Sequence, residues 1–117
     1  MIKCSVMEMV LAYVTAKDKA EAQRLAQGLL EQRLVACVNV LEGMNSFYWW
    51  KGRIEQGQET VLLLKTRSDK TQHINEWIKS FHSYETPCVL FLPITGGNPA
   101  YLQWLNSELS LKTSEEL

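Results

Sequence analysis

The fold of this chain is decided by residues 35–67, which read VACVNVLEGMNSFYWWKGRIEQGQETVLLLKTR. Two runs with strand composition lie on either side of Lys51-Gly52, and glycine readily takes the positive φ of a tight turn. The stretch therefore predicts a long β-hairpin, with Gly43 and Gly57 as candidate bulges. Each arm has about fifteen residues, or roughly 50 Å at 3.3 Å per residue, which exceeds the diameter of a domain this size. The outer half must project from the domain.

The projecting half carries large apolar side chains, which are Met44, Phe47, Tyr48, Trp49 and Trp50. Left alone, they would form an exposed patch beside unpaired strand edges, which is an aggregation hazard. A C-terminal helix of the same chain could cover one or two of them. Pairing with other copies of the chain covers them all. We therefore predict that Phe47, Tyr48, Trp49 and Trp50 lie in an interface between copies.

The rest of the chain alternates between strand and helix patterns. Short apolar runs at 9–14 and 88–92 predict two further strands. Apolar residues at helical spacing predict helices from Asp18 to Glu31, from Asp69 to Phe81 and from Asn98 onward. Their predicted starts are a capping box of Asp18 with Glu21, a capping box of Asp69 with Gln72, and Asn98 as cap before Pro99.

The element order is strand, helix, strand, strand, helix, strand and a final helix. This is the ferredoxin-like βαββαβ arrangement of the α+β class, an antiparallel sheet with two helices on one face, here with an extra C-terminal helix. A doubly wound parallel sheet is excluded because its strands need helical crossovers, whereas the two central strands join by a hairpin. The 117 residues fit one domain, 1–117, with tails at 1–6 and 112–117.

Composition excludes several classes of protein. The net charge of −1 opposes binding to nucleic acid, which relies on a basic face. Three cysteines, Cys4, Cys37 and Cys88, without a C-x-x-C motif do not indicate a disulfide framework or a structural zinc site. No apolar run is long enough to span a bilayer, and no signal peptide is evident at the start. We therefore expect a cytoplasmic protein without nucleic-acid or membrane partners.

Three motifs resemble those of the CutA divalent-ion tolerance family. The first comprises ACVN at 36–39, SFYWWKG at 46–52 and LKTR at 64–67; the others are HSYETP at 82–87 and GNPAYL at 97–102. Their order and spacing match the family from residue 9 to about residue 110. The resemblance implies a tightly packed homotrimer similar in architecture to the PII signalling proteins, a cytoplasmic location in bacteria, and a link to copper and other divalent cations.

A metal site is the first functional hypothesis. His82, Glu85 and Cys88 lie between the second predicted helix and the following strand, and imidazole, carboxylate and thiolate together suit copper or zinc. The family usually has Pro where this chain has Ser83, and Glu where it has Cys88. The alternative is structural: His82 caps its helix, Glu85 forms a surface ion pair and Cys88 is a small core residue.

A regulatory trimer is the second hypothesis. Lys65, Arg67 and Tyr84 would line a cleft between subunits that binds a small anion or metabolite. The alternative is surface ion pairing of the two basic residues with Glu55 or Glu59. We expect no enzyme, because neither a Ser-His-Asp pattern nor a nucleophile elbow is present. RNA-recognition domains share the element order, but their stacking aromatics would follow the turn, and here the aromatics precede it.

Overall fold

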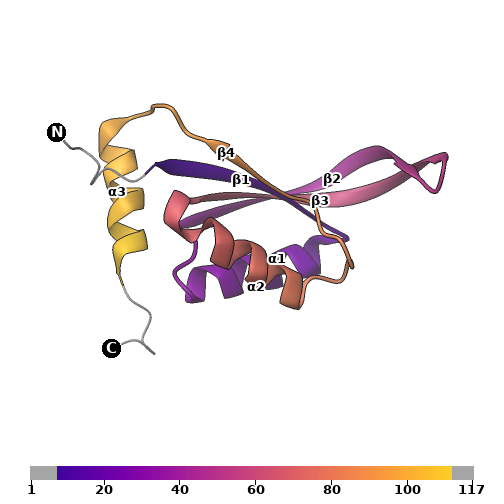
Figure 1. Ribbon diagram of the computed structural model, residues 1–117, viewed down its shortest axis with the longest axis horizontal. Coiled ribbons are helices and arrows are strands. Elements are labelled where there is room, and N and C mark those ends of the chain that lie inside the picture. The colour runs from indigo at the N-terminus through magenta and orange to yellow at the C-terminus, as the bar shows by residue number, and fades with distance from the viewer. Residues whose placement is uncertain (1–7, 112–117) are drawn as a thin grey trace.

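The structure is a computed structural model, which describes residues 8–111. The predicted tails, 1–6 and 112–117, and Cys4 lie outside the described residues. The described elements are β1 (Met9–Ala16), α1 (Lys19–Glu31), β2 (Cys37–Trp50), β3 (Arg53–Arg67), a 3₁₀ turn (Ser68–Lys70), α2 (Thr71–Phe81), β4 (Val89–Pro93) and α3 (Pro99–Ser110). The four strands form one antiparallel sheet in the order β2-β3-β1-β4, and α1 and α2 lie on one of its faces (Figure 1). The predicted ferredoxin-like fold is confirmed.

The long hairpin has one bulge. Its register shifts between Leu41 and Met44, where β2 inserts an extra residue, and Gly43 at this point has φ 78°. Glycine pays no Cβ penalty for this left-handed conformation, which explains why the bulge falls here. The second predicted bulge is wrong, because Gly57 pairs in register with Ser46.

The hairpin closes with a two-residue turn and extends beyond the helices. Lys51 and Gly52 have φ of 52° and 77°, as a type I′ turn requires. The molecule measures 51 × 32 × 21 Å, and the hairpin tip and α3 lie at its two ends (Figure 1). α3 therefore does not cover the hairpin aromatics. Their exposed fractions are 66% for Phe47, 47% for Tyr48, 72% for Trp49 and 58% for Trp50.

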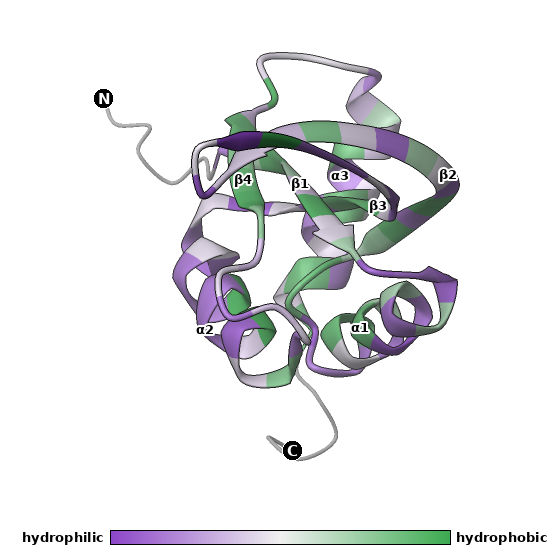
Figure 2. Cartoon of the chain, turned by 90° about the vertical axis from the view of Figure 1, so that its right-hand side faces the viewer, coloured by the Kyte–Doolittle hydropathy of each residue, from purple (hydrophilic) through white to green (hydrophobic). Residues whose placement is uncertain are grey.

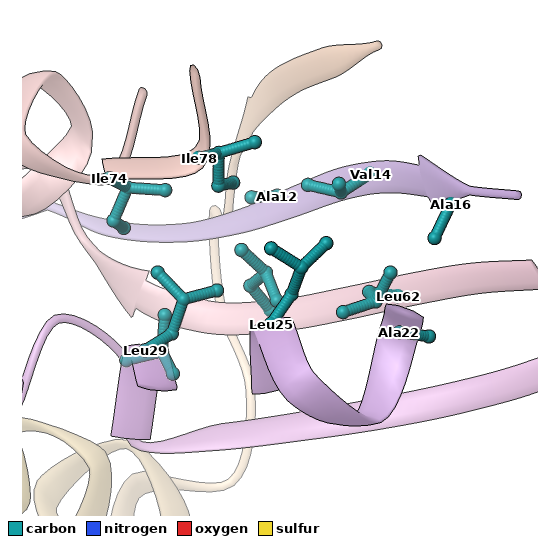
Figure 3. Close-up of a cluster of buried hydrophobic side chains, with 11 residues drawn as sticks. Ala12, Val14, Ala16, Ala22, Leu25, Leu29, Leu62, Ile74 and Ile78 are labelled. Atoms are coloured by element: carbon teal, nitrogen blue, oxygen red, sulfur yellow. The ribbon is translucent and has the colours of Figure 1, made fainter. Parts of the chain in front are cut away.

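The core fills the space between the sheet and the two helices. α1 contributes Leu25 and Leu29, and α2 contributes Ile74 and Ile78, all of them buried (Figure 3). They pack on the even-numbered side chains of β1 and β3, which are Ala12, Val14, Ala16, Leu62 and Leu64. A smaller cluster of Met9 with Leu105 and Leu109 holds α3 at the end of the sheet.

The two helices approach each other closely at Gly28. A Cβ built on Gly28 would overlap the Trp77 ring at Cη2 and Cζ2. Glycine in a helix costs about 1 kcal/mol relative to alanine. Here that cost is offset because only glycine lets the indole of α2 lie against the backbone of α1.

Gly28→Ala is therefore expected to destabilise the fold by about 1–3 kcal/mol despite the better helix propensity of alanine, because the methyl overpacks the helix contact. Urea denaturation measures the change, with the exposed Gln23→Ala as control. In the double variant with Trp77→Leu the effect of Gly28→Ala should shrink or reverse sign. An undiminished cost there would contradict the role assigned to the indole.

Two of the three predicted helix caps are confirmed. Asp18 accepts a hydrogen bond from the Glu21 N–H at 2.9 Å. Asn98 accepts from the N–H groups of Ala100 and Tyr101, at 2.9 and 3.3 Å. In the first capping box, however, the Glu21 carboxylate reaches the N–H of Lys17 and not that of Asp18.

The predicted cap at Asp69 is wrong. α2 begins at Thr71, and its preceding residue, Lys70, makes no side-chain capping bond. Asp69 lies in the 3₁₀ turn and accepts two hydrogen bonds from the Arg67 guanidinium, at 2.6 and 3.0 Å. A bidentate, charge-assisted pair is stronger than a neutral cap, which explains the outcome.

The face of the sheet opposite α1 and α2 is apolar. Residues paired across neighbouring strands share a face, and Tyr13 pairs with both Leu63 and Leu90. We call this surface the open sheet face; it comprises Leu11, Tyr13, Leu41, Leu63, Leu90 and Leu92. Within the described chain Leu41, Leu90 and Leu92 are 55%, 57% and 48% exposed. Figure 2 shows the hydrophobic colouring of β4 and of parts of β2.

Candidate functional site

The two faces of the projecting hairpin carry different side chains. Alternate strand residues point to opposite faces, so Tyr48 and Trp50 lie on one side, and Phe47 and Trp49 on the other. Tyr48 is paired with Glu55, which therefore shares its face. The four aromatics predicted for one interface thus belong to two surfaces.

A cleft of about 700 Å³ lies between the Tyr48 face of the hairpin and the loop at 84–88. Its lining contains three glutamates and no lysine, arginine or histidine. The lining residues are Tyr13, Thr15, Met44, Ser46, Tyr48, Trp50, Glu55, Glu59, Tyr84, Glu85, Thr86 and Cys88. The cleft is therefore acidic and partly aromatic.

Two hydrogen bonds hold the carboxylate of Glu59 in place in the cleft. Ser46 Oγ donates to its Oε1 at 2.7 Å, and Tyr84 Oη donates to its Oε2 at 2.9 Å. Burial, the hydrogen bond to Glu59 and the charge of that carboxylate all raise the pKa of Tyr84. Burial, and then the charge of Glu59, raise the pKa of the Cys88 thiol. Negative charge is thus disfavoured on both groups.

A second, buried carboxylate holds the loop that walls the cleft. Glu21 is 1% exposed. Its carboxylate accepts hydrogen bonds from Ser83 N at 2.6 Å, from Ser83 Oγ at 3.0 Å and from Lys17 N at 3.0 Å. Burial favours the neutral form, but the hydrogen bonds from Lys17 and Ser83 outweigh it, and the pKa of Glu21 falls below its usual 4.5.

His82 is buried beneath this loop. Its side chain is 0% exposed, and its Nε2 lies 2.7 Å from the carbonyl oxygen of Thr15. A carbonyl only accepts, so Nε2 carries the hydrogen and donates. Nδ1 accepts from Tyr84 N–H at 3.0 Å. Both ring nitrogens are therefore engaged, and His82 is not among the residues that line the cleft.

The structure brings together two of the three predicted metal ligands. Glu85 and Cys88 both line the cleft, whereas His82 lies below it. Across residues 8–111, no three His, Cys, Asp or Glu side chains are grouped so that they could hold a metal ion. One chain by itself thus supplies an acidic cleft with a thiol, and not a closed ligand set.

The residues predicted to line an anion cleft between subunits lie apart within one chain. Tyr84 donates a hydrogen bond to Glu59. Glu59 lies six residues before Lys65 on β3, which separates the two residues by roughly 20 Å along the strand. Lys65 Nζ donates to Tyr101 Oη at 3.0 Å, and this hydrogen bond raises the pKa of Lys65.

Arg67 has a structural role at the same end of the sheet. Besides its pair with Asp69, its Nη1 donates to Asn106 Oδ1 at 2.8 Å and to Ser110 Oγ at 3.0 Å. The side chain is largely buried, and it fastens α3 to β3. The predicted alternative of pairing with Glu55 or Glu59 does not occur either, because both glutamates lie toward the hairpin tip.

Comparison with known proteins shows which family has this architecture. Residues 10–108 match the model of the CutA1 divalent ion tolerance protein family. The chain belongs to the CutA1 family. Among its CutA1 relatives, a CutA homolog from Xenopus laevis is 46% identical over 80% of this chain and 62% of the relative, so the chain spans less than two thirds of that protein. The divalent-cation tolerance protein CutA of Pectobacterium atrosepticum is 46% identical over 86% of this chain and 91% of its own length.

Solved CutA1 structures have the same fold. The crystal structure of CutA1 from Oryza sativa superimposes with a TM-score of 0.86 at 38% identity, and covers 89% of this chain and 95% of that one. The structure of the periplasmic divalent cation tolerance protein CutA from Archaeoglobus fulgidus gives a TM-score of 0.84 at 39% identity over 87% and 99% of the two chains. In the CutA1 chain described here, residues 8–111 contain no helix long and apolar enough to cross a membrane.

Proposed function

We propose that this CutA1 chain acts as a homotrimer that binds divalent cations, copper among them, and that it has no catalytic activity. The observation that carries the proposal is the apolar surface that one chain leaves uncovered. Leu90 on the open sheet face and Trp49 on the hairpin are both more than half exposed. Surfaces of this kind mark sites of protein association.

A closed ring accounts for both surfaces better than an open pair. The hairpin projects beyond its own sheet. In an assembly, the hairpin of one copy would therefore contact a surface of the next copy that is not the hairpin itself. Such head-to-tail contacts either close into a ring or grow into a fibre. The predicted trimer is the ring that also buries the open sheet faces of its subunits against one another.

The acidic cleft supports a role in binding cations. Its glutamates attract positive charge, and Glu85 with Cys88 offers an oxygen and a sulfur ligand on the same wall. Thiolate favours copper and zinc over magnesium or calcium. Further ligands would come from a neighbouring subunit, or from His82 if its ring released Thr15 or Tyr84. The name of the Pectobacterium relative, a divalent-cation tolerance protein, is in keeping with this role.

Calorimetric titration of the purified protein with Cu(II), Cu(I) and Zn(II) tests the cation site. We expect Cys88→Ser and Glu85→Gln each to weaken binding by about tenfold or more, because each removes one ligand. Cys37→Ser is the matched control, since Cys37 is a free thiol outside the cleft. His82→Ala measures the contribution of the imidazole. Unchanged affinity in both cleft variants would exclude Glu85 and Cys88 as ligands.

The cytoplasmic location is proposed as well. Cys37 and Cys88 are both unpaired and only partly buried, which suits a reducing compartment. The Archaeoglobus protein is named periplasmic, so subcellular fractionation of this chain in its own cells is the test. Recovery with periplasmic markers would refute the proposal.

An anion-binding regulatory trimer has less support. Within the described chain, Arg67 is fully engaged by Asp69, Asn106 and Ser110. Lys65 is held by Tyr101, and the cleft itself is acidic. No observation favours an anion over a cation there.

A further inference from the structure

The cleft beside the Tyr48 face of the hairpin combines a volume suited to a small molecule with aromatic walls. At about 700 Å³ it falls in the range of ligand sites. Tyr13, Tyr48, Trp50 and Tyr84 supply four rings to its lining, and Met44 supplies a thioether. Aromatic rings attract a cation through the negative charge of their faces, and most strongly a cation that sheds its water easily.

The carboxylates lie where such a cation would need them. Glu55 is directly opposite Tyr48 across the hairpin, so a charge and a ring stand side by side on one face. Glu59 is already positioned by Ser46 and Tyr84. A carboxylate accepts about four hydrogen bonds, and these two donors leave it capacity for a ligand.

The same features separate the cation classes. A small metal ion keeps or replaces its water with oxygen, nitrogen or sulfur atoms and gains little from indole or phenol rings. An ammonium group on an apolar body gains from both the rings and the glutamates. An anion is opposed, since the charge of Glu59 already raises the pKa of Tyr84 and of Cys88.

We propose that the part of this cleft formed by Tyr48, Trp50, Glu55 and Glu59 binds a small organic cation, an ammonium group carried on an apolar body. The inference goes beyond the proposed role with metal ions and does not depend on it. Glu59 and Glu55 neutralise the charge, and Tyr48 and Trp50 cover the apolar body. The loop at 84–88 forms the opposite wall through Tyr84.

Three probes of similar shape and different charge test whether the site prefers a positive, a neutral or a negative ligand. Benzyltrimethylammonium, benzyl alcohol and benzoate are titrated into the full chain, with calorimetry and tryptophan fluorescence as readouts. We expect the cation to bind about tenfold or more tightly than the alcohol, and benzoate to bind least, because charge is added to equal apolar contact. Equal binding of cation and alcohol, tightest binding of benzoate, or no binding of the cation would each overturn the proposal.

Matched variants locate the binding. Trp50→Leu and Glu55→Gln should each weaken benzyltrimethylammonium several-fold. Trp104→Leu changes an exposed tryptophan of α3, at the opposite end of the molecule (Figure 1), and Glu42→Gln lies outside the cleft, so both should leave its affinity unchanged. Equal losses in both pairs would contradict the assignment. Light scattering on each variant reveals a change of mass; if Glu55→Gln altered only the mass, a second copy would occupy the cleft and the proposal would fail.

Cys88→Ser separates this site from the metal site. It should weaken copper in the titration described above and leave benzyltrimethylammonium unaffected, because a serine hydroxyl changes neither the rings nor the carboxylates. Unchanged copper affinity in Cys88→Ser would count against the metal site, whereas weakened binding of benzyltrimethylammonium in this variant would count against a separate organic-cation site.

Discussion

Glu21→Ala is expected to lower the free energy of unfolding by about 3 kcal/mol. The change strands the N–H groups of Lys17 and Ser83 and the hydroxyl of Ser83, which all donate to this buried carboxylate. A buried donor left without a partner costs about 1–3 kcal/mol. Urea denaturation at one fixed protein concentration measures the effect, since association also contributes to stability.

Glu31→Ala is the matched control, because Glu31 is an exposed glutamate of the same helix. It should change stability by less than about 0.5 kcal/mol. Ser83→Ala should show a smaller cost than Glu21→Ala, since it removes only the hydroxyl bond and keeps the backbone one. Equal stabilities of Glu21→Ala and Glu31→Ala would contradict the account of the loop.

The same carboxylate gives a pH dependence of known sign. The pKa of Glu21 is lowered in the folded protein from its usual 4.5, so the unfolded chain takes up the proton first. The stabilisation by Glu21 is therefore complete above pH 4.5 and is lost as the pH falls through the lowered folded pKa. Below pH 4.5 the wild type should lose stability more steeply than Glu21→Gln in the same urea experiment.

Leu90→Glu is expected to convert the proposed trimer into monomers. Leu90 is 57% exposed in one chain, so a glutamate there is solvated in the free subunit. In the proposed assembly the same side chain is buried between sheets, where an unpaired charge costs several kcal/mol. Sedimentation velocity measures the change in mass.

Leu30→Glu is the control for that variant. Leu30 is another exposed leucine, 39% accessible, but it lies on α1 away from the open sheet face. It should leave the mass unchanged, and both variants should keep the circular dichroism of the wild type. Dissociation by Leu30→Glu, or none by Leu90→Glu, would place the interface elsewhere.

Local sequence patterns predict much of this fold because the relevant interactions are local. The turn at Lys51-Gly52 and the cap at Asn98 each depend on neighbouring residues, and both are confirmed. Asp69 is different, because its partner Arg67 holds α3 from the other side. Arg67 is only two residues from Asp69, but α3 fixes its guanidinium, and a cap motif carries no information about that tertiary contact. Gly28 is likewise explained by its close contact with the ring of Trp77, which lies nearly fifty positions away in the sequence.

The site was harder to predict than the fold. Ser83 and Glu21 meet only through the packing of α1 and α2. The capping motif at Glu21 therefore does not reveal that its carboxylate also accepts a hydrogen bond from Ser83. The hairpin register, however, follows from the turn. Counting outward from Lys51-Gly52 places Tyr48 opposite Glu55 and gives the acidic and aromatic face from sequence alone.

The mass of the wild-type protein in solution tests the central claim most directly, because the cation site and the interface both assume that copies of the chain assemble. One chain has a mass of 13.4 kDa. Sedimentation equilibrium at micromolar concentration should give three times that mass, about 40 kDa, as expected for a closed cyclic trimer. A species of 13.4 kDa that persists as the concentration rises would contradict the claim.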